Sequence, residues 1–262
     1  MIRKFQTFFI FLVLLFLYLP IVILSFYSFT SATMIGSIRG FTLDNYLTLF
    51  TEPELIEMLI GTIVLALSVA VISTILGSLG AIGAFYSRRR IKYPIEFINE
   101  IPIVNADVVT GFSVCILLIV LFRMNKASYI PLLVGQVSLC APFVYLSVMP
   151  RLKMMDGSLY EAAIDLGCSP MKAVWMVVLP QIFPGVVSGF MTAITLSLDD
   201  YFIATYTKPA AFDTISTYVV NATRGAQTQI KTALWALSAV IFLLVILITL
   251  AAGMVQSKEE SR

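Results

Sequence analysis

IGTIVLALSVAVISTILGSLGAIGAFY, residues 60–86, contains no charged side chain, and SRRR follows directly at 87–90. An α-helix needs about 20 apolar residues to cross the hydrocarbon core of a bilayer. This run is long enough to do so. The arginines at 88–90 mark its end, because charged side chains are costly inside the hydrocarbon. The stretch therefore predicts a membrane-spanning helix over 60–86.

Further apolar runs extend this pattern to six predicted spans, at 8–29, 60–86, 98–122, 129–149, 185–206 and 233–255. Hydrophobic residues make up 59% of the 262 residues and charged residues 12%, about half the charge usual for a soluble domain. The first run is too long for a signal peptide and has no small-residue cleavage site, so we expect it to remain. The sequence predicts an all-α, multi-pass helical bundle embedded in lipid, one transmembrane domain over 1–262.

Lys and Arg residues set the predicted direction of this bundle, because short cytoplasmic loops carry an excess of them. With the N-terminus inside, the inner segments hold eleven of these residues and the outer segments six. We therefore expect both termini to face the cytoplasm. Two longer polar segments lie between the predicted spans: an outer one at 30–57, with an amphipathic stretch at 41–50, and an inner one at 150–184.

Several chemistries are disfavoured by what the sequence lacks. Histidine is absent, which removes the commonest general base and metal ligand. The three cysteines, Cys115, Cys140 and Cys168, are widely spaced and show no CxxC pattern, so neither a metal site nor a disulfide framework is expected. No P-loop pattern is present, and the net charge of +2 gives no reason to expect nucleic acid. We expect a non-catalytic chain that binds no cofactor itself.

The inner segment 150–184 contains two sets of helix signals. Ser158 and Glu161 have the spacing of a capping box, which predicts a helix from Leu159. Gly167 is placed to end that helix in a left-handed conformation. Ser169 and Pro170 then predict the cap and first residue of a second helix, which we expect Leu179 and Pro180 to stop.

The first of these two helices has little side-chain bulk. Leu159, Ala162, Ala163 and Leu166 share one face by their spacing, and a helix of this kind can enter a groove on a partner closely. Glu161 and Asp165 lie four residues apart and can meet basic residues there. The alternative is an interfacial helix that only caps the bundle.

The same segment resembles a known pattern. Glu161-Ala162-Ala163, three residues, Gly167, nine residues and then Val177-x-Leu179-Pro180 is similar to the EAA loop of ABC importer permeases. Val177 replaces the isoleucine of that pattern. The six-span layout, with this loop between spans four and five, resembles the same family over nearly the whole chain.

The resemblance implies a fold like that of the type I ABC importer permeases of bacterial inner membranes. It implies three protein partners: an ABC ATPase dimer that binds ATP and Mg²⁺, a second permease subunit such as a homologous PotB-like chain, and an extracytoplasmic solute-binding protein. The expected ATPase-coupling residues are Ser158, Glu161, Ala162, Ala163, Asp165, Gly167, Leu179 and Pro180.

Acidic residues within the predicted spans suggest what is carried. Ionisable side chains in a span are costly and often mark a pathway. Asp107 falls in the third span, and Asp199 and Asp200 fall in the fifth, next to Tyr201. An acidic lining would attract a cation, and Tyr201 can add a cation–π contact. The alternative is that Asp199 and Asp200 simply reach the outer interface where their helix ends.

Three stretches, at 41–46, 101–104 and 197–201, resemble the PotC-type spermidine/putrescine permeases. This implies polyamine uptake by alternating access. Permeases for iron, sulfate, molybdate or 2-aminoethylphosphonate share much of the layout and stay open as alternatives. An ATP-independent carrier leaves the EAA spacing unexplained, and a membrane enzyme lacks a nucleophile–base motif.

Overall fold

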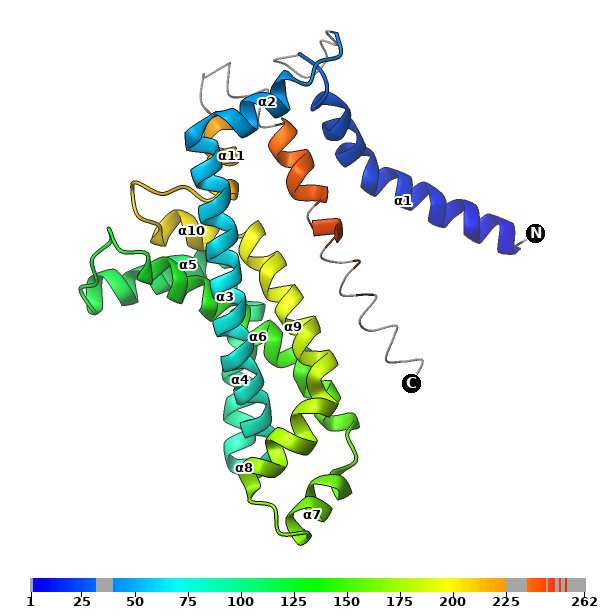
Figure 1. Ribbon diagram of the computed structural model, residues 1–262, viewed down its shortest axis with the longest axis vertical. Helices are drawn as coiled ribbons and strands as arrows, with labels where there is room; N and C mark the ends of the chain where they lie inside the picture. Colours follow the sequence, from blue (N-terminus) through cyan, green and yellow to red (C-terminus); the bar gives the residue numbers. More distant parts are fainter. Residues whose placement is uncertain are drawn as a thin grey trace. The chain divides into compact units, whose positions relative to one another are not determined.

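The computed structural model describes residues 2–31, 40–224, 235–243 and 245–247, together with 250 and 253. Helices account for most of this part of the chain (Figure 1). In chain order they are α1 (Ile2–Tyr27), α2 (Asp44–Thr51), α3 (Pro53–Tyr86), α4 (Arg89–Val104), α5 (Asp107–Cys115), the π-helix η1 (Ile116–Leu121), α6 (Ile130–Met154), α7 (Gly157–Asp165), α8 (Pro170–Ala173), the π-helix η2 (Val174–Val178), α9 (Leu179–Asp199), α10 (Phe202–Thr207) and α11 (Ile215–Arg224).

Four helical stretches are long and apolar enough to cross a membrane: 6–27, 53–86, 130–154 and 170–199. These helices coincide with the predicted spans near 8–29, 60–86 and 129–149. The helix at 235–247 is apolar but shorter, and most of the remaining residues of the predicted span 233–255 lie outside the described part.

The predicted third span, 98–122, is wrong as a single straight helix. The chain bends by 108° between α4 and α5, so that 98–104 ends one helix and 107–121 forms the next. Asn105 is extended at the break and its amide donates to Thr110 Oγ1 at 3.2 Å. Asp107 opens α5, where a negative charge is favoured by the exposed N–H groups of the first turn.

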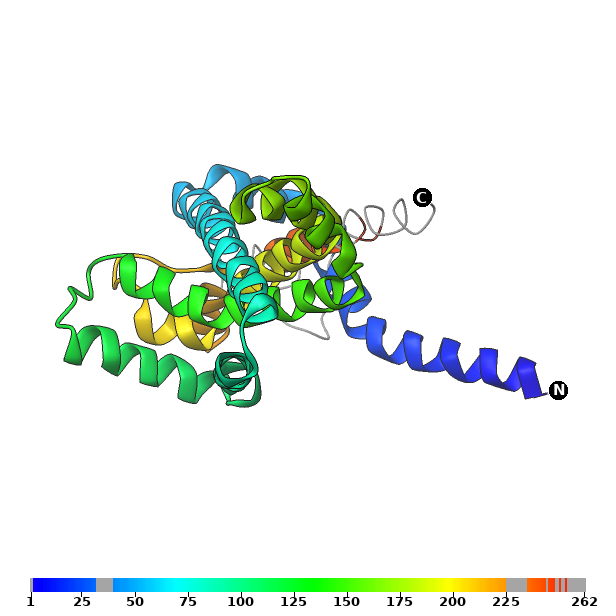
Figure 2. The ribbon, with the colours of Figure 1, turned by 90° about the horizontal axis from the view of Figure 1, so that it is seen from below.

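The predicted fifth span, 185–206, also differs. The helix α9 ends at Asp199, and α10 begins at Phe202 after a short break. Ile203 of α10 is fully buried. A Cβ atom on Gly111 of α5 would lie 3.0 Å from Ile203, and one on Gly135 of α6 would lie 2.7 Å from it. The two glycines therefore let α10 lie closely against both α5 and α6 (Figure 2).

The described residues form two compact units, 1–57 with 218–247 and 58–217 with 248–262. In the first unit, the outer segment folds back on the end of α1. Asn45 of α2 is buried, and its amide donates to the carbonyls of Ser28 and Thr30 at 2.9 and 2.8 Å. Thr30 also pairs with Phe41 in an isolated β-bridge.

The second unit is organised around the pair α6 and α9, where glycines let two backbones approach. A Cβ on Gly185 would lie 2.9 Å from the carbonyl oxygen of Ser147, and one on Gly189 would lie 3.0 Å from Val144 Cγ1. Any larger side chain would push the helices apart, because helix packing in membranes depends on such close contact.

The same spacing continues toward the end of α9. The thiol of Cys140 donates to the carbonyl of Ala193 at 3.6 Å, and the Ser197 hydroxyl donates to Gln136 Oε1 at 2.7 Å. Every fourth residue of α9 from 185 to 197 is thus small and faces α6, which keeps the two helices in one antiparallel register. We call this set the small-residue seam: Gly185, Gly189, Ala193 and Ser197.

Candidate functional site

The segment between α6 and α9 begins with a capped helix, but the cap is not the predicted one. Asp156, not Ser158, is the N-cap of α7, and its carboxylate accepts from the Ser158 N–H at 3.0 Å. Asp and Ser are comparable N-caps, and the aspartate stands two residues earlier in the chain. Hydrogen bonding to the backbone and side chain of Ser158 lowers the pKa of Asp156, so the cap is charged at neutral pH.

The glycine turn after α7 forms as predicted. Gly167 has a φ of +86°, the left-handed region that other residues rarely adopt. The Cys168 N–H donates to the Ala163 carbonyl at 3.0 Å, which closes the helix end as in a Schellman motif. Ser169 is then the N-cap position of α8 and Pro170 stands in its first turn, although the Ser169 hydroxyl makes no capping bond.

The predicted stop at Leu179 and Pro180 is wrong. Helix continues from α8 through η2 into α9 without interruption. A proline inside a helix lacks an N–H and clashes with the carbonyl four residues before it. Here the π-helical turn η2 directly precedes Leu179 and Pro180, and a π-bulge of this kind widens the turn. The helix therefore continues past Pro180 instead of ending there.

Large apolar side chains are exposed around α7 and α8. Leu166 is 87% exposed and Trp175 63%. Glu161, Ala162 and Asp165 are also exposed, whereas Ala163 is buried. We call the exposed apolar set the loop surface: Leu159, Leu166, Met171, Trp175 and Met176.

One aromatic contact joins this segment to a spanning helix. The ring of Tyr160 in α7 lies 4.8 Å, centroid to centroid, from that of Tyr86 at the end of α3. The segment also continues directly into α6 at one end and α9 at the other (Figure 1). A movement of α7 is therefore mechanically connected to three spanning helices.

The predicted pathway carboxylates differ in their surroundings. Asp107, the first residue of α5, and Asp199, the last of α9, are exposed. Asp200 is only 8% exposed, and its carboxylate accepts from the N–H groups of Ile203 and Ala204 at 3.1 and 2.9 Å. Asp200 therefore caps α10. Tyr201, which follows Asp200 in the sequence, is half-buried.

The model of one protein family, described as "Binding-protein-dependent transport system inner membrane component", matches residues 73–259. The chain belongs to this family. It is the permease subunit of an ABC importer, a multi-pass inner-membrane protein.

Named relatives and solved structures agree with this family. The chain is 30% identical to the spermidine/putrescine transport system permease protein PotC of Haemophilus influenzae, over 92% of this chain and 93% of that one. It is 29% identical to the putrescine transport system permease protein PotI of Escherichia coli K12, over 80% and 76%. A bacterial ABC transporter that imports alginate contains a chain with the same fold, with a TM-score of 0.76, 17% identity and coverage of 98% and 95%.

A buried polar network in the permease was not predicted. Gln136 is fully buried in α6; its amide nitrogen donates to Asp200 Oδ2 at 3.0 Å and its oxygen accepts from Ser197. The network links α6, α9 and the start of α10. A signal was present in the sequence, since Gln136 is the only amide side chain in the apolar run 129–149, and polar side chains in spans often hydrogen-bond between helices.

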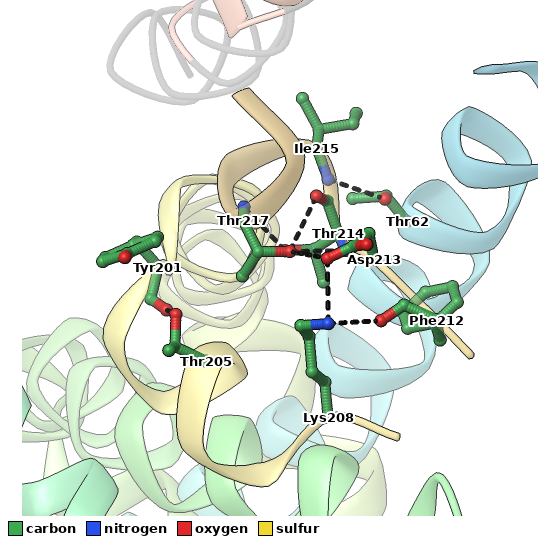
Figure 3. Close-up of polar contacts among 9 residues, drawn as sticks. All are labelled: Thr62, Tyr201, Thr205, Lys208, Phe212, Asp213, Thr214, Ile215 and Thr217. Atoms are coloured by element: carbon green, nitrogen blue, oxygen red, sulfur yellow. Dashed lines mark hydrogen bonds and ion pairs between the residues drawn. The ribbon is translucent and has the colours of Figure 1, made fainter. Parts of the chain in front are cut away.

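The segment after α10 is held by a second polar cluster (Figure 3). The Lys208 ammonium forms an ion pair with Asp213 at 2.9 Å and donates to the Phe212 carbonyl at 2.9 Å. Thr217 donates to the same aspartate at 3.0 Å, and the Ile215 N–H donates to Thr62 Oγ1 of α3 at 3.2 Å. Lys208 and Asp213 thus neutralise each other while the segment is tied to α3.

Proposed function

We propose that this permease carries polyamines, spermidine or putrescine, across the membrane by alternating access. The supporting observation is the exposure of two carboxylates in a chain whose relatives are named as polyamine permeases. Among the residues that the structure describes, the one ion pair joins Lys208 and Asp213. Asp107 and Asp199 therefore have no cationic partner there and suit a cationic solute better than an oxyanion.

The proposed coupling site is the 158–180 loop, with Ser158, Glu161, Ala162, Ala163, Asp165, Gly167, Leu179 and Pro180 as its residues. An ABC ATPase dimer, which binds ATP and Mg²⁺, would cover the loop surface. Leu159 and Leu166 of this surface precede the apolar stretch 170–199, and large exposed apolar side chains outside a span are expected to have a protein partner. The permease itself would hydrolyse nothing.

The remaining partners follow the same scheme. A second permease subunit, a homologue or a copy of this chain, would complete the channel, and an extracytoplasmic binding protein would deliver the solute. A related alginate transporter was solved in complex with its periplasmic protein. Because Lys and Arg are in excess in alternate segments, we expect both termini to lie in the cytoplasm; cysteine labelling of intact cells at each terminus tests this orientation.

The experiment that tests the function uses the whole complex in proteoliposomes, with ATP supplied on the side of the membrane where the ATPase subunits lie. We expect ATP-dependent uptake of labelled putrescine or spermidine that requires the binding protein. Iron, 2-aminoethylphosphonate, sulfate and molybdate serve as competitors. Uptake of one of these compounds instead of a polyamine would identify that compound as the solute. Polyamine uptake without the ATPase or without ATP would show a carrier that works independently of ATP.

The proposed pathway carboxylates are tested in the same assay. Asp107→Asn with Asp199→Asn removes both exposed charges and keeps the side-chain shape. We expect about a tenfold loss of uptake rate per lost charged contact. Asp44→Asn, an exposed change in the first turn of α2, is the matched control. Unchanged kinetics in the double variant would remove these two residues from the pathway. Asp200 needs separate treatment, because its substitution also removes the cap of α10.

A further inference from the structure

Two carboxylates on α4 have no role in the scheme above. Glu96 and Glu100 lie four residues apart, so they share one face of the helix. Glu100 falls inside the predicted span 98–122, where an acidic residue is costly. The structure describes no Lys or Arg in an ion pair with either one.

The contact between α4 and α6 fixes where these carboxylates lie. The amide of Asn99 donates to the Pro142 carbonyl at 3.4 Å. The two helices run in opposite directions. The start of α4 follows Tyr86, and the end of α6 comes shortly before Tyr160. Because the rings of Tyr86 and Tyr160 are in contact, the start of α4 lies near the end of α6. One turn from the Asn99 contact, Glu96 therefore comes level with Tyr145.

Tyr145 carries an unsatisfied polar group at the level of these carboxylates. Its side chain is 4% exposed, and its hydroxyl has no hydrogen-bond partner among the described residues. Glu96 and Glu100 both interact electrostatically with this phenol. A buried hydroxyl without a partner costs about 1–3 kcal/mol, so the phenol and the two carboxylates form an incomplete polar site.

The helix α3 closes the site from another side. A Cβ on Gly80 would lie 3.9 Å from Cδ2 of the Tyr145 ring, and one on Gly77 would lie 2.7 Å from the carbonyl oxygen of Ala141. Glycine at 77 lets α3 approach α6 closely and cover one side of the ring.

The chemistry of this site fits an organic ammonium group. Two carboxylates and a phenol oxygen accept N–H donors, and a charged donor strengthens such hydrogen bonds. A metal ion fits less well, since no group of three or more acidic, Cys or His ligands gathers in the described chain. Tyr145 is nine residues from Gln136 along α6, about 14 Å, so this site is separate from the cluster around Asp200.

We propose that Glu96, Glu100 and Tyr145 form a second ammonium-binding site for the solute, toward the α7 end of the membrane domain. This proposal rests on the proposed polyamine function and adds to it. A diamine or triamine leaving the carboxylates near Asp199 would meet a second acidic site before its release. The inner site would lower the energy of the solute midway through transport.

The test uses the full complex in proteoliposomes and in detergent. In the variant Glu96→Gln with Glu100→Gln we expect putrescine uptake to fall at least about tenfold. The complex in detergent, without binding protein, should also bind labelled putrescine about tenfold more weakly. ATP hydrolysis stimulated by the loaded binding protein should persist. Tyr145→Phe should give a smaller loss of the same kind, and Glu96→Asp with Glu100→Asp should restore part of it.

The matched control is Glu54→Gln with Glu57→Gln, which removes two exposed carboxylates from the first turns of α3 and should leave putrescine binding and uptake unchanged. Normal uptake and binding in the Glu96/Glu100 variant would overturn the inner site alone. Absence of polyamine uptake by the wild-type complex would overturn the proposed function itself. If the double variant fails to assemble, Glu100→Gln carries the test, since Glu100 is exposed; equal binding of putrescine by that variant and wild type would contradict the site.

Discussion

The small-residue seam and the loop surface lie on one continuous stretch of chain, yet they have opposite characters. In the seam, glycine, alanine and serine of α9 are packed so closely on α6 that a Cβ on Gly185 has no room. On the loop surface, large side chains such as Leu166 and Trp175 are mostly exposed. The seam is formed by two helices of this chain, whereas no other part of the described chain covers the exposed side chains of the loop surface.

This difference separates what holds the permease together from what drives it. In lipid, apolar side chains alone give helices little reason to associate, so close backbone packing must supply the stability. Outside the spans, exposed apolar side chains are unfavourable in water and indicate a partner. Changes in the seam should therefore affect folding, and changes in the loop surface should affect association and coupling.

The largest effect on stability is expected from Gly185→Leu. The new side chain would collide with the Ser147 carbonyl and with Arg151, and backbone cannot move aside cheaply. We expect a loss of about 3 kcal/mol or more, seen as a lower unfolding midpoint of the purified complex in detergent. Gly83→Leu is the control, because nothing lies within 4 Å of its Cβ position. An equal loss in both variants would contradict the seam as a tight contact.

A smaller loss is expected from Gln136→Leu. The change keeps the apolar bulk but removes the donor to Asp200 and the acceptor for Ser197. Interhelical hydrogen bonds in membranes contribute about 1–2 kcal/mol, and we expect a destabilisation of that size in the same unfolding measurement. Gln181→Leu, at an exposed position of α9, should be neutral. A neutral Gln136→Leu would mean that the network adds nothing to the packing of α6 on α9.

Gly167→Ala tests the turn between α7 and α8, which lies within the loop surface. No atom lies within 4 Å of a Cβ at this position, so the cost comes from the positive φ alone, about 1 kcal/mol. A reoriented turn would also move α8 relative to α7, so we expect uptake to fall while ATP hydrolysis continues. Gly157→Ala, also in open space, should preserve both. Tight coupling in Gly167→Ala would show that the turn geometry is not needed.

Much of the arrangement of spans and of the loop between α6 and α9 could be predicted from the sequence. Hydropathy located the spans because each needs a long apolar run, and the Gly167 turn was predicted because its φ favours glycine. The break between α4 and α5 was missed, although Asn105 and Asp107 interrupt the apolar run and are good residues for a helix start. Proline at 180 misled the prediction, since a π-turn can relieve a proline clash and leaves no sequence signal.

The site residues show where local sequence stops being informative. Asp199 and Asp200 are neighbours with the same side chain, but one is exposed and the other is buried as a cap. Which of them is buried depends on where α9 ends and on Gln136, 64 residues away. Glu96 and Glu100 were overlooked for the same reason: their significance comes from Tyr145, which only the packing of α4 on α6 brings near.

The smallest effect on folding, and the clearest contrast with Gly185→Leu, is expected from Leu166→Asp. This side chain is 87% exposed. Its replacement should therefore change the free energy of unfolding of the permease by no more than about 0.5 kcal/mol. A charge at the centre of an apolar contact is costly to bury, so the ATPase should no longer co-purify at micromolar subunit concentrations. Leu47→Asp, 61% exposed in α2, is the control that should keep the ATPase. If Leu166→Asp retained the ATPase and coupled transport, the loop surface would not be the ATPase docking site. The exposed apolar side chains of the loop surface would then require a different partner.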